Sequence, residues 1–549
     1  MCATEARRRR KRGKLPPLTR RVAIHPEVCE GCGDCSRQSN CLSVVPLETA
    51  FGTKRAIDQS ACNQDFSCLK GFCPSFVTLD GVRPRSGAGL REKTADTTVD
   101  REFPGILPPP ALPATERPYN LLLTGVGGMG VITLGALIGM AAHLDGKGVS
   151  VLDMTGLAQK YGAVFSHLRI ADRPEDIHAV RIATGEAHAL IGGDLVVSAG
   201  SEALSRLLAG QSRAVVSDAE TPTAEFTRDR DWKLPGEALR QRLRETVGAE
   251  AVQFIDAQRL ALQLMGDAIY TNLLLLGHAW QSGLVPVSLG ALQRAIELNG
   301  TAVEANLEAF AWGRRAAVFP ERVAALAGPS PEYRPREWTL DALIEHRAAH
   351  LTDYQDAALA ARYRARVATI RALGDDALTR TVAEQYARLL APKDEYEVAR
   401  LWVEGDFLRR LAEQFEPVEA GAGLRPAFHL VPPWSRQAGA DGRPRKIRFG
   451  PWLLPVLRVL AAGRRLRGRW FDPLRFLPDK ALDHALLADY EADLDLILRT
   501  GPGPAARQLA AWPAEVRGFG PVRADAVTRA RPRRAAAREE LAGPSATPA

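Results

Sequence analysis

Seven of the eight cysteines in this 549-residue chain fall between Cys29 and Cys73, and only Cys2 lies outside that stretch. A secreted protein held together by disulfides spreads its cysteines over the fold, whereas a tight group in a long chain indicates metal binding. The spacing is C-x2-C-x2-C-x5-C in the first part and C-x5-C-x4-C-P in the second. In order, the seven are Cys29, Cys32, Cys35, Cys41, Cys62, Cys68 and Cys73.

The C-x2-C-x2-C triple is the most specific part of this pattern. Three thiolates at that spacing surround one face of a four-iron cube, and in bacterial ferredoxins the fourth ligand is a distant cysteine followed by proline. Cys73 precedes Pro74 and fits that part. The predicted ligands of a 4Fe–4S cluster are therefore Cys29, Cys32, Cys35 and Cys73.

The other three cysteines, Cys41, Cys62 and Cys68, are predicted metal ligands of a second cluster that lacks a fourth cysteine at normal spacing. A three-iron cluster, a four-iron cluster with one ligand that is not cysteine, and reduced thiols without metal all stay open for them. Zinc is the competing interpretation of the cysteine group, because structural zinc sites also take four thiolates. Such sites usually use paired CxxC knuckles, so the triple favours iron and sulfur.

The formal net charge of +8 is confined to one end of the chain. Residues 1–21 hold nine Lys or Arg against one acid, so the rest of the chain sums to zero. The folded body therefore gives no electrostatic indication of nucleic-acid binding. No apolar run reaches the length of about 18 residues that a membrane span needs, and no apolar core follows the arginines as a secretion signal requires. We expect a cytoplasmic protein.

Composition and periodicity divide the chain into segments. They are a disordered basic tail (1–21), a ferredoxin-like 4Fe–4S module (22–80), a Pro-rich linker (81–118), an α/β domain (119–317), a mainly helical domain (335–525) and a frayed tail (526–549).

Within the α/β domain, apolar runs alternate with helical stretches. Strands are expected at 119–124, 148–154, 168–170, 194–199 and 253–256, and helices at 131–143 and 268–315. This alternation predicts βαβ units, so the fold class is α/β with a Rossmann-like, mostly parallel sheet.

A glycine-rich loop, formed by Gly125, Gly127, Gly128 and Gly130, joins the first expected strand to the first expected helix. It meets the G-x-G-x-x-G pattern of dinucleotide-binding loops, with Asp153 near the place of a ribose-binding acid. Amides at a helix start can bind a phosphate-bearing ligand, which makes these glycines candidate cofactor-binding residues. The competing interpretation is that they only let strand and helix pack closely.

The segment after Asp153 is rich in polar side chains. Gln159, Lys160, Ser166 and His167 are expected just past the carboxyl end of a strand, where α/β proteins usually bind ligands. Together they predict a functional edge of the domain.

Several stretches share their motifs with one enzyme family. They are CEGCGDCSRQSNC…CNQDFSCLKGFCPS, TGVGGMGVIT, GLAQKYGAVFSHLRI and AIELNGTAVEANLEAFAWGR. In this order they resemble indolepyruvate ferredoxin oxidoreductase, the large fused bacterial form of the 2-oxoacid:ferredoxin oxidoreductases. KDEYEVARLW (393–402), FGPWLLPVLRVL (449–460) and VRGFG (516–520) resemble the C-terminal domain of unknown function of that enzyme.

The resemblance implies a chemistry. A 2-oxoacid is decarboxylated on thiamine diphosphate with Mg²⁺, the acyl group passes to coenzyme A, and single electrons leave through 4Fe–4S clusters to ferredoxin. Residues 119–317 resemble the gamma-type module of the family. By that resemblance the loop of Gly125 to Gly130 and the segment of Gln159, Lys160 and Gly162 face the thiamine or coenzyme A site instead of NAD. No residue of this chain is identified as catalytic.

One departure from the family concerns thiamine diphosphate. Thiamine enzymes hold its magnesium with a GDG motif, whereas no Gly-Asp pair in this chain is followed by Gly. The thiamine-binding domains of the family precede the cysteine block, where this chain has only 28 residues. We therefore expect the C-terminal half of the fused enzyme, either as a separately encoded subunit or as a truncated gene product. It is expected to work in an oligomer and to need a thiamine-diphosphate-binding subunit. An NAD(P)- or flavin-dependent iron–sulfur oxidoreductase and a non-enzymatic zinc-binding protein stay open as alternatives.

Overall fold

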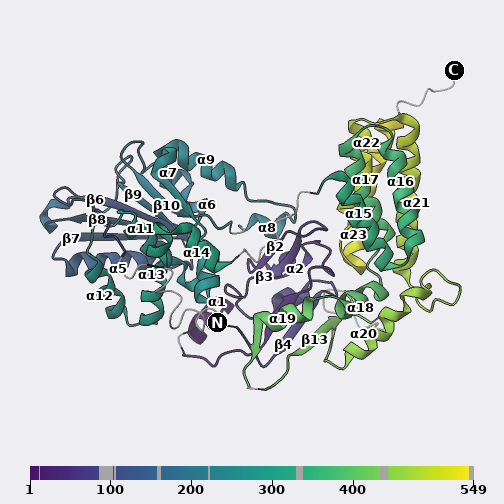
Figure 1. The fold of residues 1–549 in the computed structure, drawn as a ribbon, viewed down its shortest axis with the longest axis horizontal. Coiled ribbons are helices and arrows are strands. Elements are labelled where there is room, and N and C mark those ends of the chain that lie inside the picture. The colour runs from purple at the N-terminus through teal and green to yellow at the C-terminus, as the bar shows by residue number, and fades with distance from the viewer. Residues whose placement is uncertain are drawn as a thin grey trace. The chain divides into compact units, whose positions relative to one another are not determined.

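The chain divides into two compact units in the computed structural model (Figure 1). Unit 1 comprises residues 1–15, 85–225 and 232–331, and unit 2 comprises residues 16–84, 226–231 and 332–549. The cysteine-rich block and the C-terminal region therefore belong to the same unit. The structure describes residues 1–11, 13–85, 103, 107–156, 162–220, 223–328, 338–419, 421–432 and 443–542.

Unit 1 is built on a six-stranded sheet with the order β11-β10-β9-β6-β8-β7. Its strands are β6 (Tyr119–Val126), β7 (Gly148–Thr155), β8 (Ala163–Ala171), β9 (Ala189–Gly192), β10 (Arg213–Ser217) and β11 (Val252–Ile255). Strands β11, β10, β9 and β6 pair with their neighbours in parallel, whereas β8 lies between β6 and β7 and runs antiparallel to both. The predicted α/β class with a mostly parallel sheet is confirmed.

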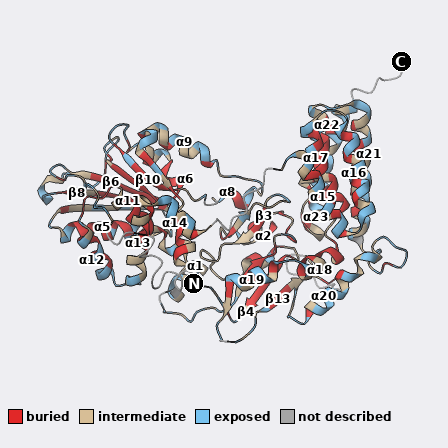
Figure 2. Ribbon diagram, viewed as in Figure 1, coloured by how far each residue is buried: buried red, intermediate tan, exposed pale blue. Residues whose placement is uncertain are grey.

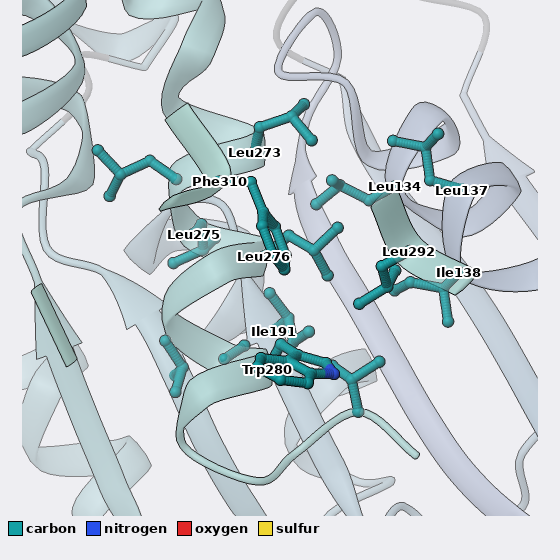
Figure 3. Packing of buried hydrophobic residues seen from close by; sticks show 14 of the residues in the cluster. Leu134, Leu137, Ile138, Ile191, Leu273, Leu275, Leu276, Trp280, Leu292 and Phe310 are labelled. Atoms are coloured by element: carbon teal, nitrogen blue, oxygen red, sulfur yellow. The ribbon is translucent and has the colours of Figure 1, made fainter. Parts of the chain in front are cut away.

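Both faces of this sheet are covered, because successive side chains of a strand point to opposite sides. On β6, Leu121 and Leu123 join one core cluster and Leu122 joins the other. The first face carries helices α5 (Val131–Leu144), α11 (Thr271–Gln281), α12 (Leu289–Asn299) and α13 (Val303–Val318), and the second carries α6 (Leu195–Ser198), α7 (Ser201–Leu204) and α9 (Gly236–Val247). Figure 3 shows Trp280 of α11 and Phe310 of α13 in the first core.

Helices α11 and α13 cross closely because glycines stand at their contact. A Cβ on Gly313 would lie 1.9 Å from the carbonyl oxygen of Leu274, and one on Gly277 would lie 2.0 Å from that of Phe310. The two backbones therefore approach too closely for any other residue at these positions.

One expected strand of unit 1 is wrong. The strand expected at residues 194–199 is instead helix α6 (Leu195–Ser198) with its two caps, and the preceding strand β9 ends at Gly192. The side chain of Asp194 accepts a hydrogen bond from the amide of Val197 and so starts a helix, which overrides the strand preference of the apolar run that follows. Strand β10 was not expected.

The two expected tails are also partly wrong. Residues 3–11 form helix α1 (Ala3–Lys11), in which Glu5 pairs with Arg8 and Arg9 at 3.1 and 3.0 Å. At the other end, the expected frayed tail is helical up to residue 542 in α23 (Gly520–Ala542). Buried Val527 and Ala530 hold this helix against the core of unit 2.

Unit 2 combines the cysteine block with strands from far along the chain. The block contains β1 (Arg21–Ile24), α2 (Asp34–Ser39), β2 (Val44–Leu47), β3 (Lys54–Ile57), η1 (Ser67–Lys70), β4 (Phe76–Asp80) and β5 (Val82–Pro84). Strands β13 (Arg425–Leu430) and β14 (Ile447–Phe449) extend an antiparallel sheet with the order β1-β4-β13-β14, and β12 (Phe415–Pro417) pairs with β5.

The rest of unit 2 is helical, as predicted for the C-terminal region. A bundle consists of α15 (Leu340–Tyr354), α16 (Ala357–Arg371), α17 (Asp376–Leu390), α21 (Pro478–Thr500), α22 (Pro504–Ala511) and α23. Helices α18 (Glu395–Glu404), α19 (Phe407–Gln414) and α20 (Leu453–Ala462) pack on the sheet of β1 and β4. Figure 2 shows buried residues along the inner sides of the bundle. Among the described residues, no helix has the length and apolar character needed to cross a bilayer.

Candidate metal centre and glycine-rich loop

The cysteines of unit 2 lie in two groups, and all of them are free thiols. The first group lines one cavity. Its members are Cys29, Cys32, Cys35 and Cys73, the four cysteines that the spacing selects. Cys41, Cys62 and Cys68 interact with one another electrostatically and form the second group.

Local backbone geometry brings the first group together. Gly31 and Gly33 adopt left-handed conformations with φ of 64° and 76°, which lets the chain turn between the cysteines. The amide of Gly31 donates to the sulfur of Cys29 at 3.3 Å. Helix α2 begins after Gly33 and buries Cys35 on its inner side.

The second wall of the cavity comes from the segment before β4. A Cβ on Gly71 would lie 2.6 Å from the Cα of Cys35, so this glycine lets the two segments meet. Two residues later, the sulfur of Cys73 lies 2.9 Å from the hydroxyl oxygen of Ser75. Amide and hydroxyl groups at the sulfurs are among the features that set the potential of an iron–sulfur cluster.

Burial controls the ionisation of these thiols. Burial, together with the neighbouring Cys73 and Cys29, raises the pKa of Cys32 to about 12. The pKa of Cys35 is raised well above its usual value for the same reasons. Burial also raises the pKa of Cys73, although Lys446 acts in the opposite direction. Four thiolates in this space therefore need a cationic core between them, which metal coordination supplies.

The chemistry of the donor set fits an iron–sulfur cluster: four thiols around one cavity, with cysteine spacing that zinc sites seldom use. Among the described residues, no three His, Cys, Asp or Glu side chains form a group that could hold a metal ion. In the second group, burial raises the pKa of Cys68 to about 12 and also raises that of Cys62. The carboxylate of Asp65 adds to both shifts and so lies beside this group.

A buried carboxylate holds the glycine-rich loop of unit 1. Asp194 accepts a hydrogen bond from the amide of Val126 at 2.7 Å and one from the amide of Val197 at 2.9 Å. Burial raises the pKa of Asp194, and these amide bonds act against that rise. The amide of Gly127 donates to the carbonyl oxygen of Gly162 at 2.7 Å. Two amides of the loop therefore already have acceptors within the protein.

Steric contacts explain two of the four glycines. A Cβ on Gly125 would lie 2.9 Å from Val131, and a Cβ on Gly130 would lie 2.4 Å from the side chain of Asn272. These contacts favour the packing interpretation at both positions. Gly128 has a φ of 102° and open space around its Cβ position.

Strand β8 separates the loop from residues that the sequence placed near it. Asp153 lies exposed on edge strand β7, two strands away from β6, so it does not stand beside the loop as a ribose-binding acid does in a dinucleotide fold. Ser166 and His167 lie within β8 and are fully buried, so they do not form a functional edge. Gln159 and Lys160 lie outside the described residues.

His167 is part of the core. Its Nδ1 accepts a hydrogen bond from the amide of Ile182 at 3.3 Å. Burial, together with the charges of Arg206 and Arg181, lowers the pKa of His167 to about 4. The imidazole is therefore neutral at physiological pH.

Sequence reasoning missed Asp194 and Asn272, which shape the glycine-rich loop. Asp194 carries a usable signal, because an Asp that follows glycines and precedes an apolar run is a common helix N-cap. Asn272 carries none, since its contact with Gly130 joins residues far apart in the sequence.

Two family models match this chain. Residues 120–316 match one described as pyruvate ferredoxin/flavodoxin oxidoreductase, and residues 340–536 match one described as a family of unknown function, DUF6537. Two archaeal relatives are named indolepyruvate oxidoreductase subunit IorB. The one from Pyrococcus horikoshii is 28% identical over 205 residues, which are 37% of this chain and 96% of the relative. The one from Methanothermobacter thermautotrophicus is 27% identical over 203 residues, 36% of this chain and 97% of the relative.

Solved structures also match. The gamma subunit of a keto/oxoacid ferredoxin oxidoreductase from Geobacter sulfurreducens is 22% identical, covers 36% of this chain and 98% of its own, and has a TM-score of 0.26. A 2-oxoglutarate:ferredoxin oxidoreductase from Magnetococcus marinus is 16% identical, covers 43% of this chain and 37% of its own, and has a TM-score of 0.28.

Proposed function

We propose that this chain is the iron–sulfur electron-transfer and gamma-domain part of an indolepyruvate-type enzyme. The premise is that residues 120–316 make the chain a member of the 2-oxoacid:ferredoxin oxidoreductase family. Such an enzyme oxidatively decarboxylates an aryl 2-oxoacid to an acyl-CoA and passes the electrons to ferredoxin. The observation that carries the proposal is the cavity lined by four cysteines in the same chain as the gamma-type domain.

In this proposal the first cysteine group holds a 4Fe–4S cluster, which accepts and releases one electron at a time when bound. The chain contributes the four thiolates, the hydroxyl of Ser75 beside Cys73 and a cavity walled by buried side chains. Cys41, Cys62 and Cys68 hold a second cluster in this proposal.

In unit 1, we propose that the loop around Gly128, with Gly162 and the adjoining Gln159 and Lys160, faces thiamine diphosphate or coenzyme A. Gly128 is the open position of the loop, which supports this role there. A separate subunit would bind thiamine diphosphate and Mg²⁺, and ferredoxin would accept the electrons. We propose a cytoplasmic location, because free thiols such as these persist in a reducing compartment.

Anaerobic reconstitution of the full chain with iron and sulfide tests the cluster. We expect broad visible absorption that dithionite bleaches, and a loss of about four irons per chain in Cys35→Ser. Cys2→Ser, which changes an exposed cysteine of unit 1, is the matched control and should keep all its iron. A colourless protein that retains zinc through the same procedure contradicts the proposal.

Arylpyruvate-dependent reduction of viologen tests the place of the chain in the enzyme. With thiamine diphosphate, Mg²⁺ and coenzyme A present, we expect no turnover by this chain alone and turnover after a thiamine-diphosphate-binding subunit is added. Robust activity of the chain alone would refute the proposed division of labour.

A further inference from the structure

The domain that matches the family of unknown function supplies part of the charge around the cysteine cavity. We infer that its residues Lys393 and Lys446 are positioning residues that raise the reduction potential of the cluster held by the first cysteine group. This inference rests on the proposed function, because it requires that the group holds a cluster.

The sheet of the cysteine block is closed by the C-terminal domain. Side chains of β1 alternate: Val22 and Ile24 join the core that contains the cysteines, whereas Ala23 joins the core that contains helices α18 to α20. Strand β13 pairs with β4 and continues the sheet. A block of about 60 residues has a small core and is marginally stable by itself, so the added strand and helices extend that core.

His25, the residue that follows β1, is also held by contacts with the C-terminal domain. The Nε2 of His25 lies 2.9 Å from the carbonyl oxygen of Leu401 in α18, and its ring stacks on Phe407 with centroids 4.2 Å apart. Four residues later the chain reaches Cys29. The C-terminal domain therefore fixes the segment that presents the first cysteine.

Behind Cys29 lies a group of charges from both parts of unit 2. The ammonium of Lys393 lies 2.7 Å from the carboxylate of Glu30 and donates to the carbonyl oxygen of Cys29 at 3.1 Å. Arg388 also contacts Glu30, at 3.2 Å. Lys54 of the cysteine block is 7% exposed and interacts with the same carboxylate. Lys393 and Arg388 thus pair with one carboxylate at this ligand, and burial lowers the pKa of the third basic group, Lys54, to about 7.

Lys446 stands on the other side of the cavity, at the start of β14. Its ammonium donates to the carbonyl oxygen of Gly71 at 2.5 Å and lies 4.6 Å from the ring centroid of Phe76. It interacts with Cys73 and Cys35 of the first group and with Cys68 of the second. One half-buried cation therefore lies near both cysteine groups.

The sign of the effect follows from charge. A cluster with four thiolates carries net negative charge, and reduction adds one electron, so a nearby cation stabilises the reduced form more than the oxidised form. The interaction is stronger where protein replaces water around the charges. A solvent-exposed cation at a similar position acts much less, because water and salt screen it.

Redox titration followed by electron paramagnetic resonance, at fixed pH and ionic strength, tests this inference. We expect Lys446→Met to weaken reduction about tenfold, a shift of about 59 mV to more negative potential for one electron. Lys446→Arg keeps the charge and should stay within about twofold of the wild-type equilibrium constant. Lys70→Met, which removes an exposed lysine two residues from Cys68, is the matched control with the same charge change and should also stay within about twofold.

A fully iron-loaded Lys446→Met protein with the wild-type potential, or an equal shift in Lys70→Met, would overturn the inference. If Lys446→Met does not retain iron, Lys393→Met provides the test. This variant should lower the reduction potential of the cluster. The double variant Glu30→Gln/Lys393→Met should restore the wild-type potential, because the net charge behind Cys29 is then the same as in the wild type. A potential that stays low in the double variant overturns the inference. Absence of iron from the reconstituted wild-type chain would instead refute the proposed function.

Discussion

Gly71→Ala is a sharp test of the cysteine cavity. Gly71 follows η1 with a φ of −57° and a ψ of 131°, a backbone conformation that alanine adopts without strain. The consequence of the substitution is therefore steric only. The added Cβ would lie 2.6 Å from the Cα of Cys35, 2.7 Å from its Cβ and 2.9 Å from its amide nitrogen.

The size of the effect follows from these distances. Ordinary contact begins at 3.4 Å, so the backbone of Cys35 must retreat by roughly 0.8 Å from its present 2.6 Å. Cys35 is buried in α2, and overpacking of this kind costs about 1–3 kcal/mol of unfolding free energy. Metal–ligand distances tolerate about 0.2 Å, so the same displacement removes one of four ligands from its place.

Two measurements check this reasoning. Urea unfolding of the iron-free chain should show the loss of about 1–3 kcal/mol in unit 2, and reconstitution should yield less iron than the wild type retains. Gly423→Ala is the matched control, because nothing lies within 4 Å of its Cβ position and its φ is not left-handed. It should change the unfolding free energy by less than about 0.5 kcal/mol. Wild-type stability and iron content in Gly71→Ala would refute the described cavity.

Two further substitutions test single buried groups. Asp194→Ala should lower the unfolding free energy of unit 1, measured in urea, by about 2–4 kcal/mol, because two amides lose their acceptor. The control Asp256→Ala, at a half-exposed helix cap, should lower it by only about 1 kcal/mol. Equal losses in the two variants would contradict the role of Asp194. Burial lowers the pKa of His25 to about 3, against the bond to Leu401, so the unfolded chain takes up a proton below pH of about 6.5 that the folded chain refuses. The free energy of unfolding should therefore decrease by about 1.4 kcal/mol for each unit by which the pH is lowered between about 6.5 and about 3. His25→Phe should lose this contribution to the slope, while the other histidines keep theirs. An unchanged slope would contradict the neutral buried ring.

Local patterns predicted much of the fold and the grouping of the cysteines. The strand at β6 and the helix at α5 were predicted because their apolar runs lie beside turn-forming glycines. The C-x2-C-x2-C spacing and the Cys-Pro pair selected the four thiols that line one cavity, since three of them lie within seven residues of the sequence. Their role as cluster ligands stays a prediction.

Strand order and tertiary contacts could not be predicted in the same way. Periodicity locates β7 and β8 but does not tell that β8 folds back between β6 and β7, which separates Asp153 from the glycine-rich loop. The helix at residues 195–198 was predicted as a strand because four apolar residues have no clear period, and only the cap at Asp194 distinguishes the two.

The arrangement of charge around the cysteine cavity is the clearest case of a property that the sequence alone does not reveal. Apart from residues 1–21 the chain is neutral, yet Lys54 and Lys393 lie together behind Cys29, and Lys446 lies opposite. The acids Glu30 and Asp34 also line the cavity, so a sum taken over the chain does not describe the arrangement of charge there. Because protein around the cavity screens charge less than water does, the local arrangement and not the sum determines how readily a cluster there accepts an electron. Two of these three lysines come from beyond residue 390, so the cysteine block alone does not fix its own electrostatics.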